Sequence, residues 1–164
     1  MRVIVACSSK HGSTEGIAEA IAERLHQRGH DAVAVRLTDE VDLTGIEAVV
    51  LGSAIYAGSW MKEATAFAEA NSDILSKLPL WLFSSGPLGT EVHDEEEQPR
   101  QLAELTATLR PRAHRVFFGA LDHDKLGFGE RMMVKAVQAP QGDFRDWNAI
   151  SEWADEIARE LAEG

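Results

Sequence analysis

Short apolar runs alternate with segments of helical periodicity along most of the chain. Runs rich in Val, Ile, Leu and Phe, bounded by Gly, Pro or Ser, predict five strands at Arg2–Cys7, Asp31–Leu37, Ala48–Tyr56, Leu80–Ser84 and Arg115–Leu121. Apolar residues at three- and four-residue spacing predict helices at Thr14–Arg28, Trp60–Ser76, Gln98–Leu109, Gly127–Gln138 and Asp146–Ala162. Asp39–Gly45 is short and acidic, so we expect a helical turn or a loop there.

The predicted strands are continuous apolar runs, which is typical of a parallel sheet covered by helices on both faces. The pattern therefore predicts an α/β fold, a doubly wound three-layer sandwich with a five-stranded parallel sheet. A chain of 164 residues suits a single domain over residues 1–164. We expect Trp81, Trp147 and Trp153 in the core.

Composition narrows the class of protein. The formal net charge of -11 disfavours nucleic acid as a partner, because phosphates repel an acidic surface, and it favours a basic partner or solubility. The single cysteine, Cys7, cannot form an internal disulfide, and no apolar run of about 18 residues could span a bilayer. We expect a cytoplasmic protein that is not an integral membrane protein. The acidic run Glu91–Gln98 is typical of an exposed loop.

The turn after the first strand is the first candidate site. It reads Ser9, Lys10, His11, Gly12, Ser13 and Thr14, and a helix pattern follows it directly. Hydroxyls and backbone N–H groups at a helix N-terminus can bind an anion such as a phosphate. The alternative is an ordinary turn in which Ser13 or Thr14 caps the helix.

Two further loops belong to the same candidate site. In an open parallel sheet, ligands bind beyond the carboxyl ends of the strands, where the strand order reverses. The loop after the third strand holds Ser53, Ala54, Ile55, Tyr56, Ala57, Gly58 and Trp60, and the loop after the fourth holds Ser85, Gly86, Pro87, Leu88 and Gly89. Small residues let the backbone approach a ligand, while Tyr56 and Trp60 offer flat faces or pack on the next helix. A planar cofactor that carries a phosphate matches these three loops.

The turn Ser9–Thr14 resembles the phosphate loop of flavodoxins, and the other two loops resemble the flavin loops of that family. The resemblance implies non-covalently bound FMN as a one- or two-electron carrier. Within the family the chain looks nearest to the menaquinone-dependent protoporphyrinogen oxidase type. That likeness rests on Gly119–Leu121, Arg131–Lys135, Gly142–Asp143 and Asp146–Trp147.

The resemblance leaves two functions open. One is an FMN-dependent oxidoreductase with a quinone acceptor, and the alternative is an electron carrier between partner proteins. The third loop lacks the aromatic residue of ordinary flavodoxins, so we expect a one-sided flavin stack on Tyr56 or Trp60. The oxidase type has a basic segment where this chain has the acidic Glu91–Gln98, which disfavours an anionic porphyrin as substrate. Met132 and Met133 suggest a core, partner or homodimer contact.

Other chemistries lack the residues that they need. A phosphatase with Cys7 as its nucleophile would need Arg where Ser13 stands. The sequence lacks the Gly-rich loops of dinucleotide-binding and nucleoside triphosphate-binding proteins at the expected positions. It also lacks the paired acids of receiver domains. His114, His123 and Asp124 do not have the spacing of metal ligands, so no metal is predicted. We name no catalytic residue, since a bound flavin would carry the electron chemistry.

Overall fold

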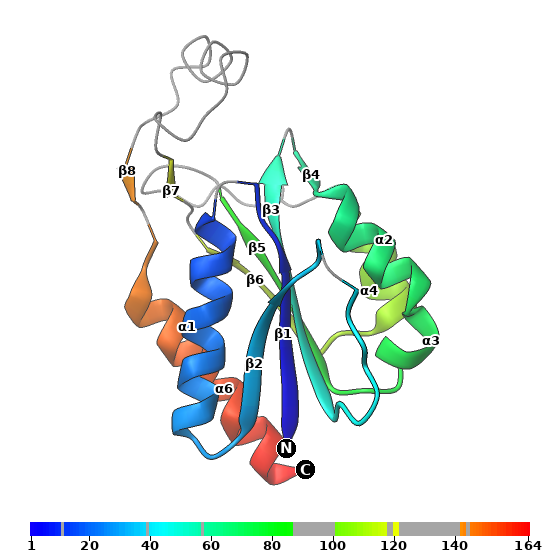
Figure 1. The fold of residues 1–164 in the computed structure, drawn as a ribbon, viewed down its shortest axis with the longest axis vertical. Helices are drawn as coiled ribbons and strands as arrows, with labels where there is room; N and C mark the ends of the chain where they lie inside the picture. Colours follow the sequence, from blue (N-terminus) through cyan, green and yellow to red (C-terminus); the bar gives the residue numbers. More distant parts are fainter. Residues whose placement is uncertain are drawn as a thin grey trace, which may run out of the picture.

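Strands and helices alternate along the chain in the computed structural model, which describes residues 1–10, 12–38, 40–56, 58–86, 101–117, 120–121, 142–143 and 145–164 (Figure 1). The strands are β1 (Arg2–Ser8), β2 (Asp31–Arg36), β3 (Ala48–Tyr56), β4 (Ser59–Trp60), β5 (Leu80–Ser85), β6 (Ala113–Phe117), β7 (Ala120–Leu121) and β8 (Gly142–Asp143). The helices are α1 (Ser13–Gln27), α2 (Lys62–Ala70), α3 (Ser72–Leu75), α4 (Leu102–Leu109) and α6 (Trp147–Glu163).

The main sheet has the strand order β2-β1-β3-β5-β6, and all these neighbours are parallel. The chain moves from β1 to the edge at β2 and then crosses back past β1 to β3, so the strand order reverses beside β1. The predicted doubly wound sheet of five parallel strands is thus confirmed. The short β4 adds an antiparallel pairing at the end of β3, which the sequence pattern did not predict.

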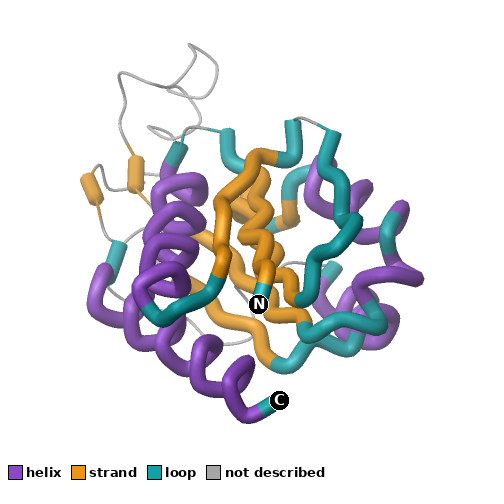
Figure 2. The backbone as a smooth tube through the Cα atoms, turned by 60° about the horizontal axis from the view of Figure 1, so that its bottom comes forward, coloured by secondary structure: helices purple, strands orange, loops and turns teal. Residues whose placement is uncertain are grey.

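Helices cover both faces of the sheet (Figure 2). Successive residues of a strand point to opposite faces. Val3, Val5 and Cys7 of β1 therefore join a core cluster with α1 and α6. Ile4 and Ala6 join the cluster under α2, α3 and α4. The continuous apolar runs in the sequence follow from this burial on both sides.

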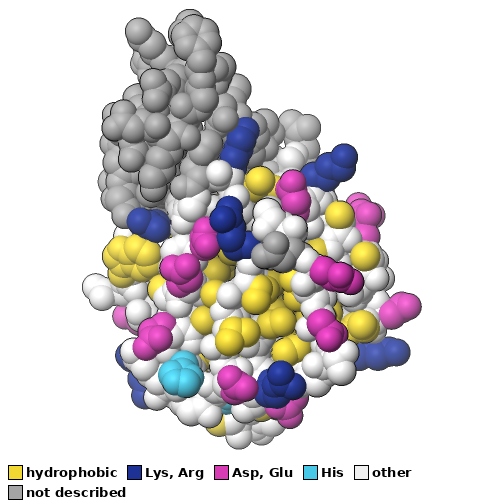
Figure 3. Space-filling view, in the orientation of Figure 1, with side chains coloured by type: hydrophobic (Ala, Val, Ile, Leu, Met, Phe, Trp, Pro, Cys, Tyr) yellow, Lys and Arg dark blue, Asp and Glu magenta, His cyan; other side chains and the backbone are white. Residues whose placement is uncertain are grey.

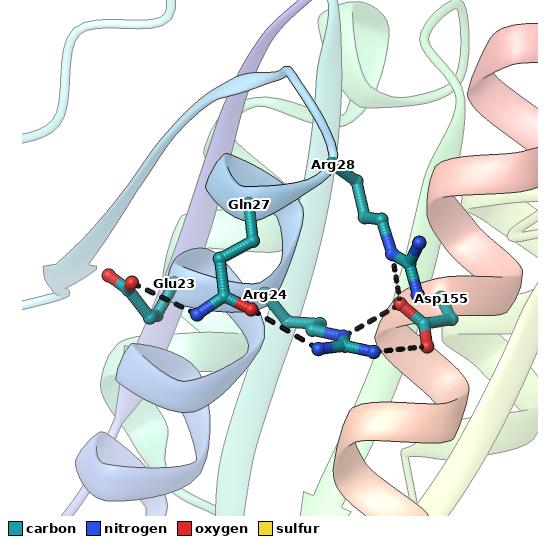
Figure 4. A network of polar contacts seen from close by, with 5 residues as sticks. All are labelled: Glu23, Arg24, Gln27, Arg28 and Asp155. Carbon is teal, nitrogen blue, oxygen red and sulfur yellow. Dashed lines mark hydrogen bonds and ion pairs between the residues drawn. The ribbon is translucent and has the colours of Figure 1, made fainter.

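Helices α1 and α6 are also joined at the surface by a polar network (Figure 4). Asp155 of α6 accepts hydrogen bonds from Arg24 Nε and Nη2 at 2.8 and 2.9 Å and from Arg28 Nε at 2.8 Å. The two guanidinium groups lower the pKa of Asp155, so the carboxylate stays charged. Gln27 accepts from Arg24 and donates to Glu23, which extends the network along α1.

An aromatic cluster lies between the sheet and α6. The ring centroids of Phe83 and Phe117 both lie within 6.3 Å of that of Trp153. Gly52 of β3 lies directly under Phe83, and a Cβ atom at this position would collide with the Phe83 ring. A glycine at this point of β3 is thus a packing requirement of the core.

Several element boundaries differ from the predicted ones. The helix expected over Trp60–Ser76 is two helices, α2 and α3, with Asn71 between them. The described part of the 37–47 segment contains no helix. The fifth predicted strand is β6, which begins two residues earlier, and Ala120–Leu121 pairs instead with Gly142–Asp143. The helix expected over Gly127–Gln138 lies outside the described residues.

The prediction that Trp147 lies in the core is wrong. It is 43% exposed, whereas Trp153 is buried. Six residues separate the two along α6, and at 100° per residue they lie on different sides of the helix. The guanidinium of Arg145 packs over the Trp147 ring, 4.6 Å from its centroid.

Candidate functional site

The carboxyl ends of the central strands carry a row of buried hydroxyls. Ser8 of β1 lies beside Ser53 of β3, which lies beside Ser84 of β5. All three side chains are buried. Because these strands are parallel, the loops after β1, β3 and β5 leave the sheet at the same edge, at the top of Figure 1. The three predicted loops therefore begin side by side.

A glycine and a side-chain hydrogen bond fix the conformation of the first loop. Gly12 is the N-cap of α1 and has a φ of 88°, a conformation that side chains other than glycine rarely adopt. Its N–H donates to Ser9 Oγ at 3.0 Å. Neither Ser13 nor Thr14 caps the helix, because Gly12 occupies that position and no side-chain cap bond forms. The capping alternative for this turn is therefore wrong.

Thr14 carries the strongest sign of a ligand in this turn. Its side chain is 0% exposed, and Oγ1 is buried without a hydrogen-bond partner among the described residues. A buried hydroxyl without a partner costs about 1–3 kcal/mol. The hydroxyl lies in the first turn of α1, where backbone N–H groups also lack partners within the helix. A phosphate oxygen bound at this helix end would give these donors an acceptor.

Arg145 adds positive charge beside the same turn, and no pattern in the sequence predicted this position. Its Nη1 lies 3.4 Å from the carbonyl oxygen of Ser13 and donates to it. A Cβ added to Gly16 would come within 2.6 Å of the same nitrogen, so the side chain lies along α1. More than a hundred residues separate Arg145 from the turn, and no spacing in the sequence connects them.

The second loop is fastened where β4 leads into α2. Trp60 N–H donates to Gln101 Oε1 at 3.1 Å, and Met61 N–H donates to Ser53 Oγ at 2.9 Å. Trp60 is 3% exposed and packs in the core cluster under α2. Its buried ring offers no face to a ligand, so Trp60 is corrected from a stacking residue to a core residue.

The remaining residues of this loop are only partly described. Ala54 and Ile55 are half-buried at the end of β3, and Gly58 has a φ of 76° in the turn to β4. Tyr56 ends β3 and pairs with Ser59, while its side chain lies outside the described part of the chain. Ala57 is also outside it. Stacking on Tyr56 stays a prediction.

The third loop begins above a buried hydrogen-bond chain. Trp60 Nε1 donates to Ser84 Oγ at 2.8 Å, and Ser84 Oγ shares a hydrogen bond of 2.7 Å with His114 Nε2. Burial lowers the pKa of His114 to about 4, so the imidazole is neutral near pH 7. These hydrogen bonds connect β4, β5 and β6 directly below the predicted site.

The described start of the third loop is short. Ser85 is buried, and Gly86 has a φ of 86° and donates its N–H to the carbonyl of Phe117 at 2.8 Å. Pro87, Leu88 and Gly89 lie outside the described residues, as does His11 of the first loop. Lys10 is exposed at the edge of that first loop.

Cys7 lies at the end of β1 but is not poised for nucleophilic chemistry. Its side chain is buried, and burial, followed by the negative charge of Glu15, raises the pKa of its thiol to about 12. A thiol with this pKa is not a thiolate near pH 7. Cys7 is therefore a packing residue of the first core cluster.

A hollow of about 530 Å³ lies away from these loops, between the C-terminal end of α1 and α6. Its lining includes Arg28, His30, Glu152, Asp155 and Arg159, so opposite charges face one another across it. Asp155 is already bonded to two arginines. We assign the site to the loops instead, because the buried Thr14 hydroxyl lies there, whereas Asp155 in this hollow is already paired.

The described residues contain neither a metal site nor a membrane span. No group of three or more His, Cys, Asp or Glu residues there could hold a metal ion. In the same part of the chain, no helix has both the length and the apolar character needed to cross a membrane.

Comparison with known proteins gives one family and many structures of the same fold. The model of the family described as "Flavodoxin domain" matches residues 4–148. No curated protein matched the sequence. A flavodoxin from the domain Archaea has 18% identity and a TM-score of 0.67, with 99% of each chain covered. Oxidised flavodoxin 1 from Bacillus cereus has 12% identity and a TM-score of 0.64, with 97% of this chain and 98% of that one covered.

A larger protein contains the same fold. Rubredoxin oxygen:oxidoreductase from Desulfovibrio gigas has 15% identity and a TM-score of 0.68. The alignment covers 99% of this chain but 36% of that one.

Proposed function

This chain belongs to the flavodoxin domain family, and on that premise we propose that it is an FMN-binding electron carrier that works with redox partner proteins. The observation that carries the proposal is the buried Thr14 hydroxyl in the first turn of α1, which has no hydrogen-bond partner in the described part of the chain. Members of this family bind flavin, and the phosphate of a bound FMN would accept a hydrogen bond from this hydroxyl.

The residues of the first loop match the phosphate end of FMN. Gly12 turns the backbone, Ser9 holds that turn, and Thr14 supplies a donor. Arg145 lies close enough to this turn to offset part of the phosphate charge. Lys10, His11 and Ser13 complete the proposed loop. Bound FMN would supply one- or two-electron transfer, and the protein would orient and tune it.

The other two loops are proposed to hold the flavin ring. The proposed contacts are Ser53, Ala54, Ile55, Tyr56, Ala57 and Gly58 from the second loop and Ser85, Gly86, Pro87, Leu88 and Gly89 from the third. Trp60 supports them from below through its hydrogen bonds to Ser84 and Gln101. The chain needs no acid or base for such a role, and none is assigned.

Enzyme activity on a porphyrinogen, with a quinone acceptor, is the less supported alternative. The solved structures that the comparison describes are flavodoxins and larger proteins that contain a similar unit. Of the C-terminal segments that suggested the oxidase type, Arg131–Lys135 and the first residue of Gly119–Leu121 lie outside the described residues. A carrier of electrons between proteins requires only the site described above, so it is the function that we propose.

Titration of the purified chain with FMN tests the proposal. The flavin absorbance spectrum is expected to shift on binding. Thr14→Ala is expected to weaken FMN binding by about 1 to 3 kcal/mol, the cost of leaving a charged phosphate oxygen short of a donor. Thr65→Ala is a matched control, since its hydroxyl donates to a carbonyl in an exposed helix turn. A folded protein that binds no FMN, or an unchanged affinity in Thr14→Ala, would contradict the proposal.

A further inference from the structure

Gly16 lies near the start of α1, and its backbone does not require a glycine. Its N–H donates to the carbonyl of Gly12 at 3.1 Å, which is the ordinary hydrogen bond of an α-helix. Its φ is not positive, unlike that of Gly12. A glycine within a helix lowers the stability of the protein relative to alanine. The glycine at this position therefore has to be explained by the space around it.

The guanidinium of Arg145 fills the space beside Gly16. A Cβ atom at this position would lie 2.6 Å from Arg145 Nη1, which is closer than such atoms approach in proteins. The same Cβ would lie 3.8 Å from Trp147 Cη2, which is an ordinary contact. Arg145 is thus the side chain that would have to move. The end of a flexible side chain moves at little cost, so Gly16→Ala would displace the guanidinium and leave α1 intact.

Two further contacts hold the same guanidinium. Its Nη1 donates to the carbonyl oxygen of Ser13 at 3.4 Å, and its Cζ lies 4.6 Å from the centroid of the Trp147 ring. Trp147 begins α6 and is 43% exposed, so its ring is only partly used for packing. An indole ring attracts a guanidinium placed over its face. The space at Gly16 and the ring of Trp147 together keep Arg145 beside the first turn of α1.

A positive charge at this turn matters because its surroundings are acidic. The chain has a formal net charge of -11, and acidic side chains are spread across the face of the molecule shown in Figure 3. Glu15 lies in the first turn of α1 itself, with Arg36 Nε at 3.5 Å from its carboxylate. Lys10 is exposed, so solvent screens its charge, whereas Arg145 is half-buried against α1. Arg145 is therefore well placed to attract an anion to the turn.

We propose that Gly16 and Trp147 are positioning residues, which hold Arg145 against the first turn of α1 and so raise the affinity for the phosphate of FMN. This inference rests on the proposed function. Neither residue touches the cofactor in this role, because Gly16 leaves room for the guanidinium and Trp147 supports it with its ring. Arg145 then adds its charge to the N–H groups of the helix end and to the Thr14 hydroxyl.

Titrations of the Gly16→Ala chain with FMN and with riboflavin test the role of Gly16. We expect the dissociation constant of FMN to rise about 3- to 10-fold, because the displaced guanidinium loses part of its interaction with the phosphate. Riboflavin lacks the phosphate and should bind as it does to the parent. Urea unfolding should show that Gly16→Ala is at least as stable as the parent, which separates a lost contact from a damaged fold.

The matched control is the same substitution in an Arg145→Gln chain. There is no guanidinium to displace in that chain, so Gly16→Ala should leave its affinity for FMN unchanged. Trp147→Leu tests the aromatic face in the same way. It keeps an apolar side chain but removes the ring, and it should weaken binding of FMN, but not of riboflavin, only where Arg145 is present.

A crystal structure of the ligand-free Gly16→Ala chain tests the geometry without FMN. Arg145 Nη1 should then lie beyond hydrogen-bond distance of the Ser13 carbonyl oxygen. Retention of that hydrogen bond, unchanged FMN affinity in Gly16→Ala, or an equal loss with and without Arg145 would overturn the role of Gly16. Unchanged FMN affinity in Trp147→Leu would overturn the role of Trp147. These results leave the proposed function standing, whereas a parent chain that binds no FMN would overturn both proposals.

Discussion

Replacing Thr14 by valine should change stability and ligand affinity in opposite directions. Valine keeps the size and branching of threonine but exchanges Oγ1 for a methyl group. In the protein without ligand, Oγ1 is buried and has no partner among the residues that the structure describes. Its removal relieves part of a desolvation cost of about 1–3 kcal/mol, so we expect the free energy of unfolding to rise by about 1 kcal/mol.

The same substitution should weaken FMN binding. A lost hydrogen bond to a phosphate oxygen costs about 1–3 kcal/mol, which corresponds to a rise of about 5- to 150-fold in the dissociation constant. Urea unfolding of the ligand-free protein measures the first quantity, and flavin titration measures the second. Thr65→Val, in α2, should change neither by a comparable amount. A Thr14→Val protein that is less stable and binds FMN as tightly as the parent would show that Thr14 does not bind the phosphate.

Three further substitutions test other parts of the structure. Gly52→Ala should lower the free energy of unfolding by about 1–3 kcal/mol in urea unfolding, because its Cβ collides with the buried Phe83 ring, and Phe83→Leu in the same chain should restore part of the loss. His114 is neutral when folded and becomes protonated when unfolded below pH 6.5, so stability should fall as pH drops from 6.5 to about 4. The slope reaches at most about 1.4 kcal/mol per pH unit, and His114→Gln should flatten it in unfolding experiments across that range. Arg145→Gln should weaken binding of FMN but not of riboflavin, which lacks the phosphate; equal losses for both ligands would place Arg145 outside the phosphate site.

The hydrophobic pattern was sufficient to predict the layers of the fold. Strand β3 has its predicted bounds, and β1, β2 and β5 differ from theirs by one residue, because burial on both faces leaves a continuous apolar run. The pattern could not predict β4. That strand has two residues, and its pairing depends on a tight turn at Gly58 rather than on periodicity.

The candidate site was predictable only in part. The sequence order of the loops showed where hydroxyls and glycines would gather, and the structure brings the starts of these loops together. It could not show that Trp60 turns into the core, because an aromatic residue after a strand is compatible with either a ligand face or a buried packing position. The position of Arg145 could not be predicted for another reason. It lies beside Ser13 because of the way α6 packs against α1. Contacts between residues far apart in sequence leave no local pattern.

We propose that the turn Ser9–Thr14 holds the phosphate of FMN. The most direct test is a parallel titration of the ligand-free chain with FMN and with riboflavin, which differ only in that phosphate. We predict that FMN binds at least about tenfold more tightly, which corresponds to about 1.4 kcal/mol or more from the phosphate. Equal affinity for the two ligands, or binding of neither by the folded protein, would contradict this account.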